Sequence, residues 1–168
     1  MAIITGTNLP DLLIGTAEAD TIDGLGANDD LYGLSGNDTI DGRSGYDFIS
    51  GGSGDDRLRG GTEGDVLFGG SGEDRVSGQS GDDYLDGGAD NDLLTGGTGA
   101  DAFVFSGFGA GVDTVEDYSF AQFDVIDTNG FGFVWYQSGN DTVIDFGTYG
   151  GVQHAIVLEN YTGAFWVI

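Results

Sequence analysis

Cysteine, lysine and long apolar runs are missing from this chain of 168 residues, and each absence removes a class of structure. Without cysteine, neither disulfides nor thiolate metal sites can hold the fold. No stretch approaches the roughly 20 apolar residues of a membrane helix, so we expect no membrane span. The first residues have neither the basic nor the apolar region of a secretory signal peptide. If the protein is exported, we expect it to leave by another route.

Positive charge is also scarce, because four arginines stand against 29 aspartates and glutamates and the formal net charge is -25. Nucleic acids and anionic membranes repel such a chain, so we exclude them as general partners. Cations are the natural partners. Disordered chains can also be as rich in glycine as this one, with its 34 glycines, but a hydrophobic content of 39% favours a folded core. The length suits one domain, or a repeat array with a cap.

A period of nine residues runs without insertion or deletion through eleven repeats, from Gly6 to Val104. When positions are numbered from 1 to 9 in each repeat, position 1 is always glycine, position 6 is always aspartate and position 8 is always apolar. Position 8 holds Leu13, Ile22, Leu31, Ile40, Ile49, Leu58, Leu67, Val76, Leu85, Leu94 and Phe103. Three columns that stay in phase over eleven units exclude an accident of composition.

Each repeat is predicted to form a tight turn and a short strand. Six glycine-rich residues can turn through positive φ, and the other three, with one buried side chain, suit a strand. Two repeats then make one coil, and equivalent turns stack along each edge of a flattened solenoid. The sequence therefore predicts an all-β fold, with a right-handed parallel β-roll over residues 1–104 and the position 8 side chains as its core.

The turns are predicted to bind calcium. One aspartate cannot satisfy Ca²⁺, which takes roughly six to eight oxygen ligands, but two stacked turns with their backbone carbonyls can. We therefore expect several ions, at most nine, between turns whose aspartates lie two repeats apart. The predicted ligands are Asp29, Asp38, Asp47, Asp56, Asp65, Asp74, Asp83, Asp92 and Asp101. The loop glycines expected to contribute backbone are Gly33, Gly36, Gly42, Gly45, Gly51, Gly54, Gly69, Gly72, Gly78, Gly81, Gly96 and Gly99.

The alternative is a solenoid without metal, in which the aspartates only hydrogen-bond the turn backbone. Repulsion between stacked carboxylates disfavours it. The first two repeats, with Pro10 and Glu18 in their turns, match the pattern least well. Terminal units of a solenoid are often atypical because they cap it, so we expect weak or absent ion binding there.

At these residues the chain resembles the RTX, or hemolysin-type, calcium-binding repeat proteins, whose consensus is Gly-Gly-x-Gly-x-Asp-x-apolar-x. Residues 51–59 and 69–77 match it completely. The resemblance implies a secreted, extracellular bacterial protein. It also implies export by a type I secretion apparatus that reads an uncleaved C-terminal signal, and folding in the calcium outside the cell.

Residues 105–168 are similar to the tail that follows such repeats in secreted bacterial proteases, lipases and alginate epimerases, with Asp-rich strands at 113–118 and 124–127. Residues 131–137 and 142–146 are predicted to form a hairpin, and 152–158 a further strand. We expect this segment to be an antiparallel β cap that the resemblance also associates with the secretion signal. The apolar end at 164–168 lacks the acidic residue that often precedes it in protease and lipase signals.

The two outer faces of the roll are predicted to differ. Odd-numbered repeats present an apolar and aromatic face that either the tail or a partner, such as a sugar, would cover. Even-numbered repeats present a polar face on which Arg57, Arg59 and Arg75 cluster. These arginines either pair with nearby acids such as Asp41 or bind a polyanion; polysaccharide binding is known for the repeat modules of alginate epimerases.

Two functions follow from these features. The first is a calcium-binding module that folds outside the cell and serves as a folding, secretion and stabilising unit. The second is a calcium-dependent module that binds extracellular polysaccharide or a cell surface. We do not expect an enzyme, because the one histidine, His154, excludes a His-Glu-x-x-His zinc site and no Gly-x-Ser-x-Gly nucleophile motif occurs.

Overall fold

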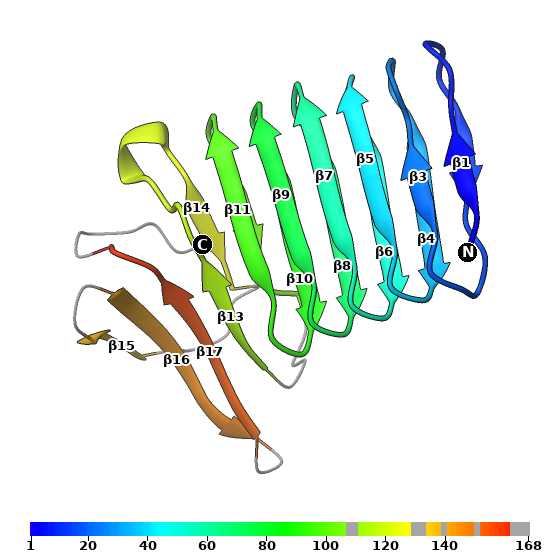
Figure 1. The fold of residues 1–168 in the computed structure, drawn as a ribbon. Coiled ribbons are helices and arrows are strands. Elements are labelled where there is room, and N and C mark those ends of the chain that lie inside the picture. The colour runs from blue at the N-terminus through cyan, green and yellow to red at the C-terminus, as the bar shows by residue number, and fades with distance from the viewer. Residues whose placement is uncertain (107–110, 129–133, 139–140, 150–151, 162–168) are drawn as a thin grey trace.

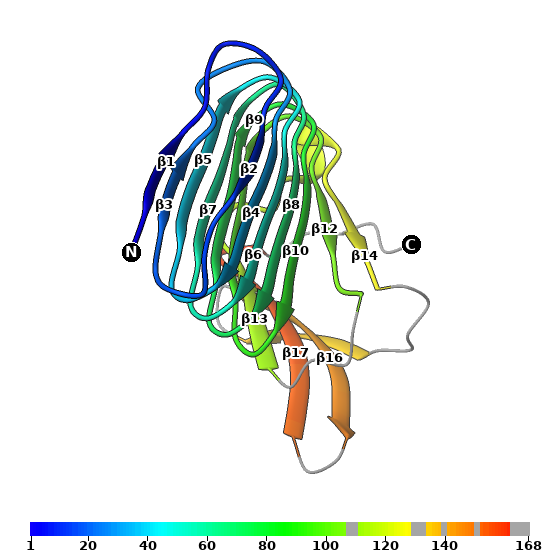
Figure 2. The same cartoon turned by 90° about the vertical axis from the view of Figure 1, so that its right-hand side faces the viewer.

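Two β-sheets face each other across a narrow core in the computed structural model, which describes residues 1–106, 111–128, 134–138, 141–149 and 152–161 (Figures 1 and 2). Strands of the roll pair in parallel with the strand two repeats further along, as Ile40 does with Leu58. Stacked turn residues such as Asp29 and Asp47 are accordingly 18 residues apart in sequence. The predicted all-β parallel roll with two repeats per coil is confirmed.

The ten-stranded sheet is named sheet A and the seven-stranded sheet is named sheet B. In spatial order, sheet A contains β1 (Ile3–Thr5), β3 (Thr21–Asp23), β5 (Thr39–Ser44), β7 (Arg57–Thr62), β9 (Arg75–Ser80), β11 (Leu93–Thr98), β13 (Gly111–Val115), β17 (Val152–Leu158), β16 (Asp141–Tyr149) and β15 (Val134–Ser138). Sheet B contains β2 (Leu12–Ile14), β4 (Asp30–Ser35), β6 (Phe48–Ser53), β8 (Val66–Ser71), β10 (Tyr84–Ala89), β12 (Ala102–Val104) and β14 (Val125–Asp127).

Strands in the middle of the roll are six residues long, twice the expected length. They continue through position 1 of the next repeat to its position 3, so the first half of each glycine-rich segment stays paired with the neighbouring coils. Gly52, for example, lies opposite Leu34 and Gly70. The true turn is therefore short, and it ends at the position 6 aspartate.

The core is the predicted ladder of position 8 side chains. From Ile22 to Phe103 each is at most 1% exposed, whereas Leu13 in the first coil is only partly buried because no coil precedes it. Val115 and Ile126 extend the ladder beyond the repeats. A core with one apolar side chain per repeat leaves each coil dependent on its neighbours for stability, as in other repeat proteins.

The parallel sheets continue past residue 104, because β13 adds to β11 and β14 adds to β12. The sheets thus continue across residues 104 and 105, and the domain boundary placed there from the sequence stays a prediction. Strand β17 then pairs in parallel with β13 and antiparallel with β16, and β15 with β16 forms the predicted hairpin. Antiparallel strands at this end confirm the expected change of topology.

The 3₁₀ turn η1 spans Phe120–Gln122, and no described helix is long and apolar enough to cross a membrane.

The outer face of sheet B carries a row of four aromatic rings, Tyr32, Phe48, Phe68 and Tyr84, whose successive centroids lie 5.6 to 5.7 Å apart. The described strands of the tail add to the edges of the two sheets and do not cover β4, β6, β8 and β10, the strands that carry this row (Figure 2). Within the described residues, the row is shielded in part by contacts between its own rings.

Candidate metal centre

Each position 6 aspartate lies at the end of a turn, held by strands on either side. From Asp20 to Asp101 the residues at this position are at most 3% exposed. All the predicted metal ligands fall within this set. The roll brings them into two columns, one along each edge, and successive members of a column come from successive coils.

One oxygen of each predicted ligand is used within the protein. Its Oδ1 accepts a hydrogen bond from the backbone N–H of the aspartate 18 residues earlier, at 2.7 to 3.0 Å. The N–H of Asp47, for instance, donates to Oδ1 of Asp65. Because the donor is always in the preceding coil, Oδ1 always faces that coil.

The other oxygen has no partner. Oδ2 is buried without a hydrogen bond in nine aspartates of the described structure: Asp29, Asp38, Asp47, Asp56, Asp65, Asp74, Asp83, Asp92 and Asp101. A buried carboxylate oxygen without a partner is costly, so buried charges are normally paired or coordinate a metal. These nine are the residues that the sequence predicts as calcium ligands.

The first glycine of each repeat borders the space beside this oxygen. A Cβ atom on Gly24 would lie 2.6 Å from Oδ2 of Asp29 and 2.9 Å from the carbonyl oxygen of Gly42, in the next coil. Gly24 does not have positive φ, so glycine is needed at position 1 for space and not for backbone conformation. A carboxylate oxygen and a carbonyl oxygen therefore converge on one small space that no side chain fills.

Positions 2 and 4 are the residues that require positive φ, and both adopt it in repeats three to eleven. The predicted loop glycines at position 4, such as Gly54 with φ 120°, belong to this group. Position 2 has the same conformation even where it is Leu34, Arg43 or Gln79, with φ from 77° to 80°. The sequence prediction missed position 2, because its residue type varies and hides the shared conformation.

The first two turns are built differently. Oδ2 of Asp20 accepts hydrogen bonds from the backbone N–H and the hydroxyl of Thr16, at 2.6 and 2.8 Å, and Oδ2 of Asp11 does the same with Thr7. Neither turn has a residue with positive φ. A threonine thus donates hydrogen bonds to the carboxylate oxygen that has no partner in the other nine turns. Weak or absent ion binding there stays a prediction, which this arrangement supports.

Burial raises the pKa of the nine aspartates with an unpartnered Oδ2, because a charged carboxylate loses its hydration there. It raises the pKa of Asp65 and Asp74 to about 8, and that of Asp47 and Asp56 to about 6. Carboxylates in neighbouring coils raise the pKa further, whereas the backbone hydrogen bond to Oδ1 lowers it. The pKa of Asp20 is instead lowered, chiefly by a backbone hydrogen bond from Ala2. Carboxylates at the centre of the column therefore need a proton or a cation.

This donor set fits Ca²⁺. Carboxylates and backbone carbonyls are the hard oxygen ligands that calcium takes, and softer metals prefer sulfur or imidazole. Within the described residues, no group of three or more His, Cys, Asp or Glu side chains is placed so that they could hold a metal ion by themselves. Each gap between stacked turns supplies two aspartates, so the remaining ligands would be loop carbonyls such as that of Gly42.

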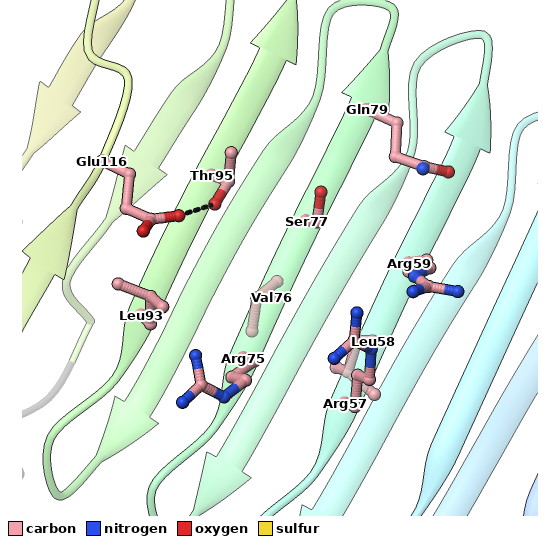
Figure 3. Close-up of a pocket in the computed structure, with 10 residues that line it drawn as sticks. All are labelled: Arg57, Leu58, Arg59, Arg75, Val76, Ser77, Gln79, Leu93, Thr95 and Glu116. Carbon is pink, nitrogen blue, oxygen red and sulfur yellow. Dashed lines mark hydrogen bonds between the residues drawn. The ribbon is translucent and has the colours of Figure 1, made fainter.

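The three arginines singled out from the sequence line a depression of about 330 Å³ on the outer face of sheet A (Figure 3). Arg57 and Arg75 lie directly opposite each other on β7 and β9, and neither side chain forms an ion pair or hydrogen bond with the described residues. Arg59 lies 3.9 Å from Asp41, so the alternative of local pairing applies to Arg59 alone among the three.

Comparison with known proteins identifies one family. The RTX calcium-binding nonapeptide repeat matches residues 5–40, 32–67 and 68–103. A search of curated proteins gives no match. Similar solved structures include the AlgE6R3 subunit of the mannuronan C5-epimerase from Azotobacter vinelandii, with 30% identity and a TM-score of 0.47 over 62% of this chain and 70% of that one.

A second similar structure is the extracellular lipase LipA from Serratia marcescens, with 19% identity and a TM-score of 0.46. The match covers 91% of this chain but only 38% of the lipase. The family match itself spans more than half of the chain and includes all nine aspartates with an unpartnered oxygen. The chain therefore belongs to the RTX calcium-binding nonapeptide repeat family.

Proposed function

We propose that the chain is a calcium-dependent folding and stabilising module of a secreted bacterial protein, with no chemistry of its own. One observation carries this proposal: nine buried carboxylate oxygens without a partner, arranged in two columns. A formal charge of -25 opposes the compact state by repulsion, and a core with one apolar side chain per repeat offsets that repulsion only weakly. Bound calcium would supply the opposite charge and the missing partner at each turn.

Calcium that binds only the folded form stabilises it by mass action, by about 2.7 kcal/mol per site when the ion is at ~100 times its dissociation constant. Several sites in contact through shared aspartates make folding cooperative in calcium. The ions are held between coils, so they add stability where the thin core alone adds little. This is the role of a structural ion.

Circular dichroism during a calcium titration tests this function. At pH 8 we expect a disordered spectrum in chelator and a cooperative change to a β-sheet spectrum as calcium is added. Magnesium at equal concentration is the control, because it keeps its water ligands and demands octahedral geometry. A β-sheet spectrum in chelator that calcium leaves unchanged would contradict the proposal.

Family membership also supports export through a type I secretion apparatus and folding in extracellular calcium. The test is expression with and without such an apparatus in a bacterial host, together with a variant lacking residues 164–168. We expect the full chain in the medium only when the apparatus is present, and the shortened chain in the cells. Equal release of both chains would contradict the assignment of the signal to that end.

The arginine pair favours a second candidate function, the binding of an anionic extracellular polysaccharide. Like charges directly opposite each other on neighbouring strands are unfavourable, and Arg57 and Arg75 face each other although acidic residues are abundant. A chain of carboxylated sugars would neutralise both. Calorimetric titration with alginate, with Arg57→Ala/Arg75→Ala against Arg43→Ala, tests this. Equal binding by both variants, or none by the native chain, would rule it out.

A further inference from the structure

Asp92 and Asp101 are the last aspartates of the repeats, yet each keeps a buried, unpartnered Oδ2 as the interior ones do. They are 3% and 1% exposed. If ion sites existed only between repeats, these two oxygens would face a coil without a partner turn. A cation bound by them would take its further carboxylate ligands from the coil that follows.

The direction of each oxygen is fixed by its surroundings. Oδ1 faces the preceding coil, from which its hydrogen bond comes. Oδ2 of Asp29 faces the following coil, because it shares the space beside Gly24 with the carbonyl oxygen of Gly42. The same arrangement recurs at Gly60, which borders Asp65 and the carbonyl oxygen of Gly78. At Gly87 and Gly96 the nearest atoms belong to Asp92 and Asp101 alone, and we infer from the interior turns that their Oδ2 atoms face the coil after the last repeat.

That coil contains Asp113 and Asp124 in the corresponding places. The backbone N–H of Asp92 donates to Oδ1 of Asp113 at 3.0 Å, and that of Asp101 donates to Oδ1 of Asp124 at 3.1 Å. This is the hydrogen bond that links every pair of stacked turn aspartates. The spacing is 21 and 23 residues in place of 18, because the connecting loops are longer.

Sheet register supports the same assignment. Leu94 pairs with Val115 and Phe103 pairs with Ile126, so the core residue two places after each aspartate continues the position 8 ladder. Burial raises the pKa of Asp113 to about 8 and also raises that of Asp124. Both carboxylates thus occupy the places of the turn aspartates in the repeats, and Asp124 is as deeply buried as they are, whereas Asp113 is partly buried.

We propose that two calcium sites lie beyond the nonapeptide repeats, one between Asp92 and Asp113 and one between Asp101 and Asp124. This rests on the proposed calcium-dependent function and extends it. Nine unpartnered oxygens then define nine gaps, seven between repeats and two between the repeats and the tail. The gaps that follow Asp11 and Asp20 hold no ion, because threonines donate hydrogen bonds to the Oδ2 atoms there.

The column also has a defined end. Oδ2 of Asp124 accepts a hydrogen bond from the backbone N–H of Ser119 at 2.7 Å, much as Oδ2 of Asp11, at the other end of the same column, accepts one from Thr7. Ions in the last two gaps would attach β13 and β14 to the roll, and β17 and β16 through β13. Calcium would therefore order the tail together with the repeats.

Calorimetry on the full chain counts the ions. We expect nine for the native chain, seven for Asp113→Asn/Asp124→Asn, and nine for Glu116→Gln, which removes an exposed charge from the same region. Asparagine keeps an Oδ1 acceptor for the backbone N–H of the preceding coil, although at position 124 it loses the acceptor for the N–H of Ser119. A native count in the double variant would overturn the proposal. No binding by the native chain would overturn the proposed function itself.

Crystals of the native chain grown with calcium give an independent measurement that does not depend on how the variants fold. Anomalous difference density is expected between Asp92 and Asp113 and between Asp101 and Asp124. Ions in the repeats with no density at these two places would overturn the inference while leaving the proposed function intact. Density at one place alone would overturn it for the other.

Discussion

The N–H of Asp47 donates a 2.8 Å hydrogen bond to Oδ1 of Asp65, and Oδ2 of the same carboxylate is buried without a partner. Each turn aspartate thus contacts the preceding coil through one oxygen and faces the following coil with the other. Oδ1 has its hydrogen-bond partner within the protein, in the preceding coil, whereas Oδ2 has none among the described residues. This asymmetry gives the column of turns a direction along the roll.

Asp65→Asn tests the forward contact at the centre of the roll. Asparagine preserves the Oδ1 acceptor but removes the charge, so we expect the loss of at least one bound ion and a several-fold rise in the calcium concentration at the folding midpoint. Circular dichroism and calorimetry measure the two effects. The matched control is Asp55→Asn, since Asp55 is exposed at position 5 of its turn. A midpoint that moves equally in both variants would mean that only net charge matters.

Gly24→Ala tests whether the first glycine is needed for space. The added carbon would lie 2.6 Å from Oδ2 of Asp29 and 2.9 Å from the carbonyl oxygen of Gly42, so we expect weaker calcium binding and a free energy of unfolding lower by about 1–3 kcal/mol. Urea unfolding in calcium measures the stability. Gly26→Ala is the control, because its nearest atom, Oγ of Ser44, is 3.1 Å away. Equal losses would contradict a spatial role for position 1.

Stability without calcium should fall as the pH rises. Burial raises the pKa of Asp47, Asp65 and Asp101 to about 6, 8 and 7, above the value of about 4 in an unfolded chain. A group with a raised pKa stabilises the folded state fully below its unfolded pKa and loses that contribution as the pH passes its folded pKa. Between pH 4 and 8 the chelated chain should therefore lose β-sheet signal, and calcium affinity should increase because protons compete less. A chelated chain more folded at pH 8 than at pH 5 would contradict this.

The repeats made most of the roll predictable. Gly42, Asp47 and Ile49 each recur in phase, and the period alone gives the pairing of coils, the core ladder and the aspartate columns. The length of the strands was not predictable in this way, because pairing through Gly52 and Gly70 depends on contacts between coils. The reason for glycine at position 1 was hidden too, since a requirement for space and one for positive φ select the same residue.

Beyond residue 104 the nine-residue period fails, and the columns continue without it. The remaining signal is the triplet of an aspartate, any residue and an apolar residue, present at Asp113 with Val115 and at Asp124 with Ile126. Loops of different length separate these triplets from the repeats, so counting residues cannot align them with Asp92 and Asp101. Sheet register aligns them directly.

The second turn offers a gain of function in place of a loss. Thr16 occupies Oδ2 of Asp20, and neither position 2 nor position 4 of this turn has positive φ. Thr16→Gly/Glu18→Gly removes the hydroxyl and supplies the consensus glycines, so we expect one additional calcium ion between Asp20 and Asp38. In chelator at pH 5, where the chain should keep β-sheet structure, the same variant should be less stable by about 1 kcal/mol for the lost hydroxyl hydrogen bond, with a further small loss from the flexibility of glycine.

Calorimetry counts the ion, and Thr16→Ser is the control because it keeps the hydroxyl and should keep the native count. An unchanged count in the glycine variant would show that the threonine does not exclude the ion. The asymmetry of the carboxylate would then have another cause, such as the single coil that precedes Asp20. A gain of one ion would instead identify Thr16 and Glu18, at positions 2 and 4, as the residues that end the calcium column.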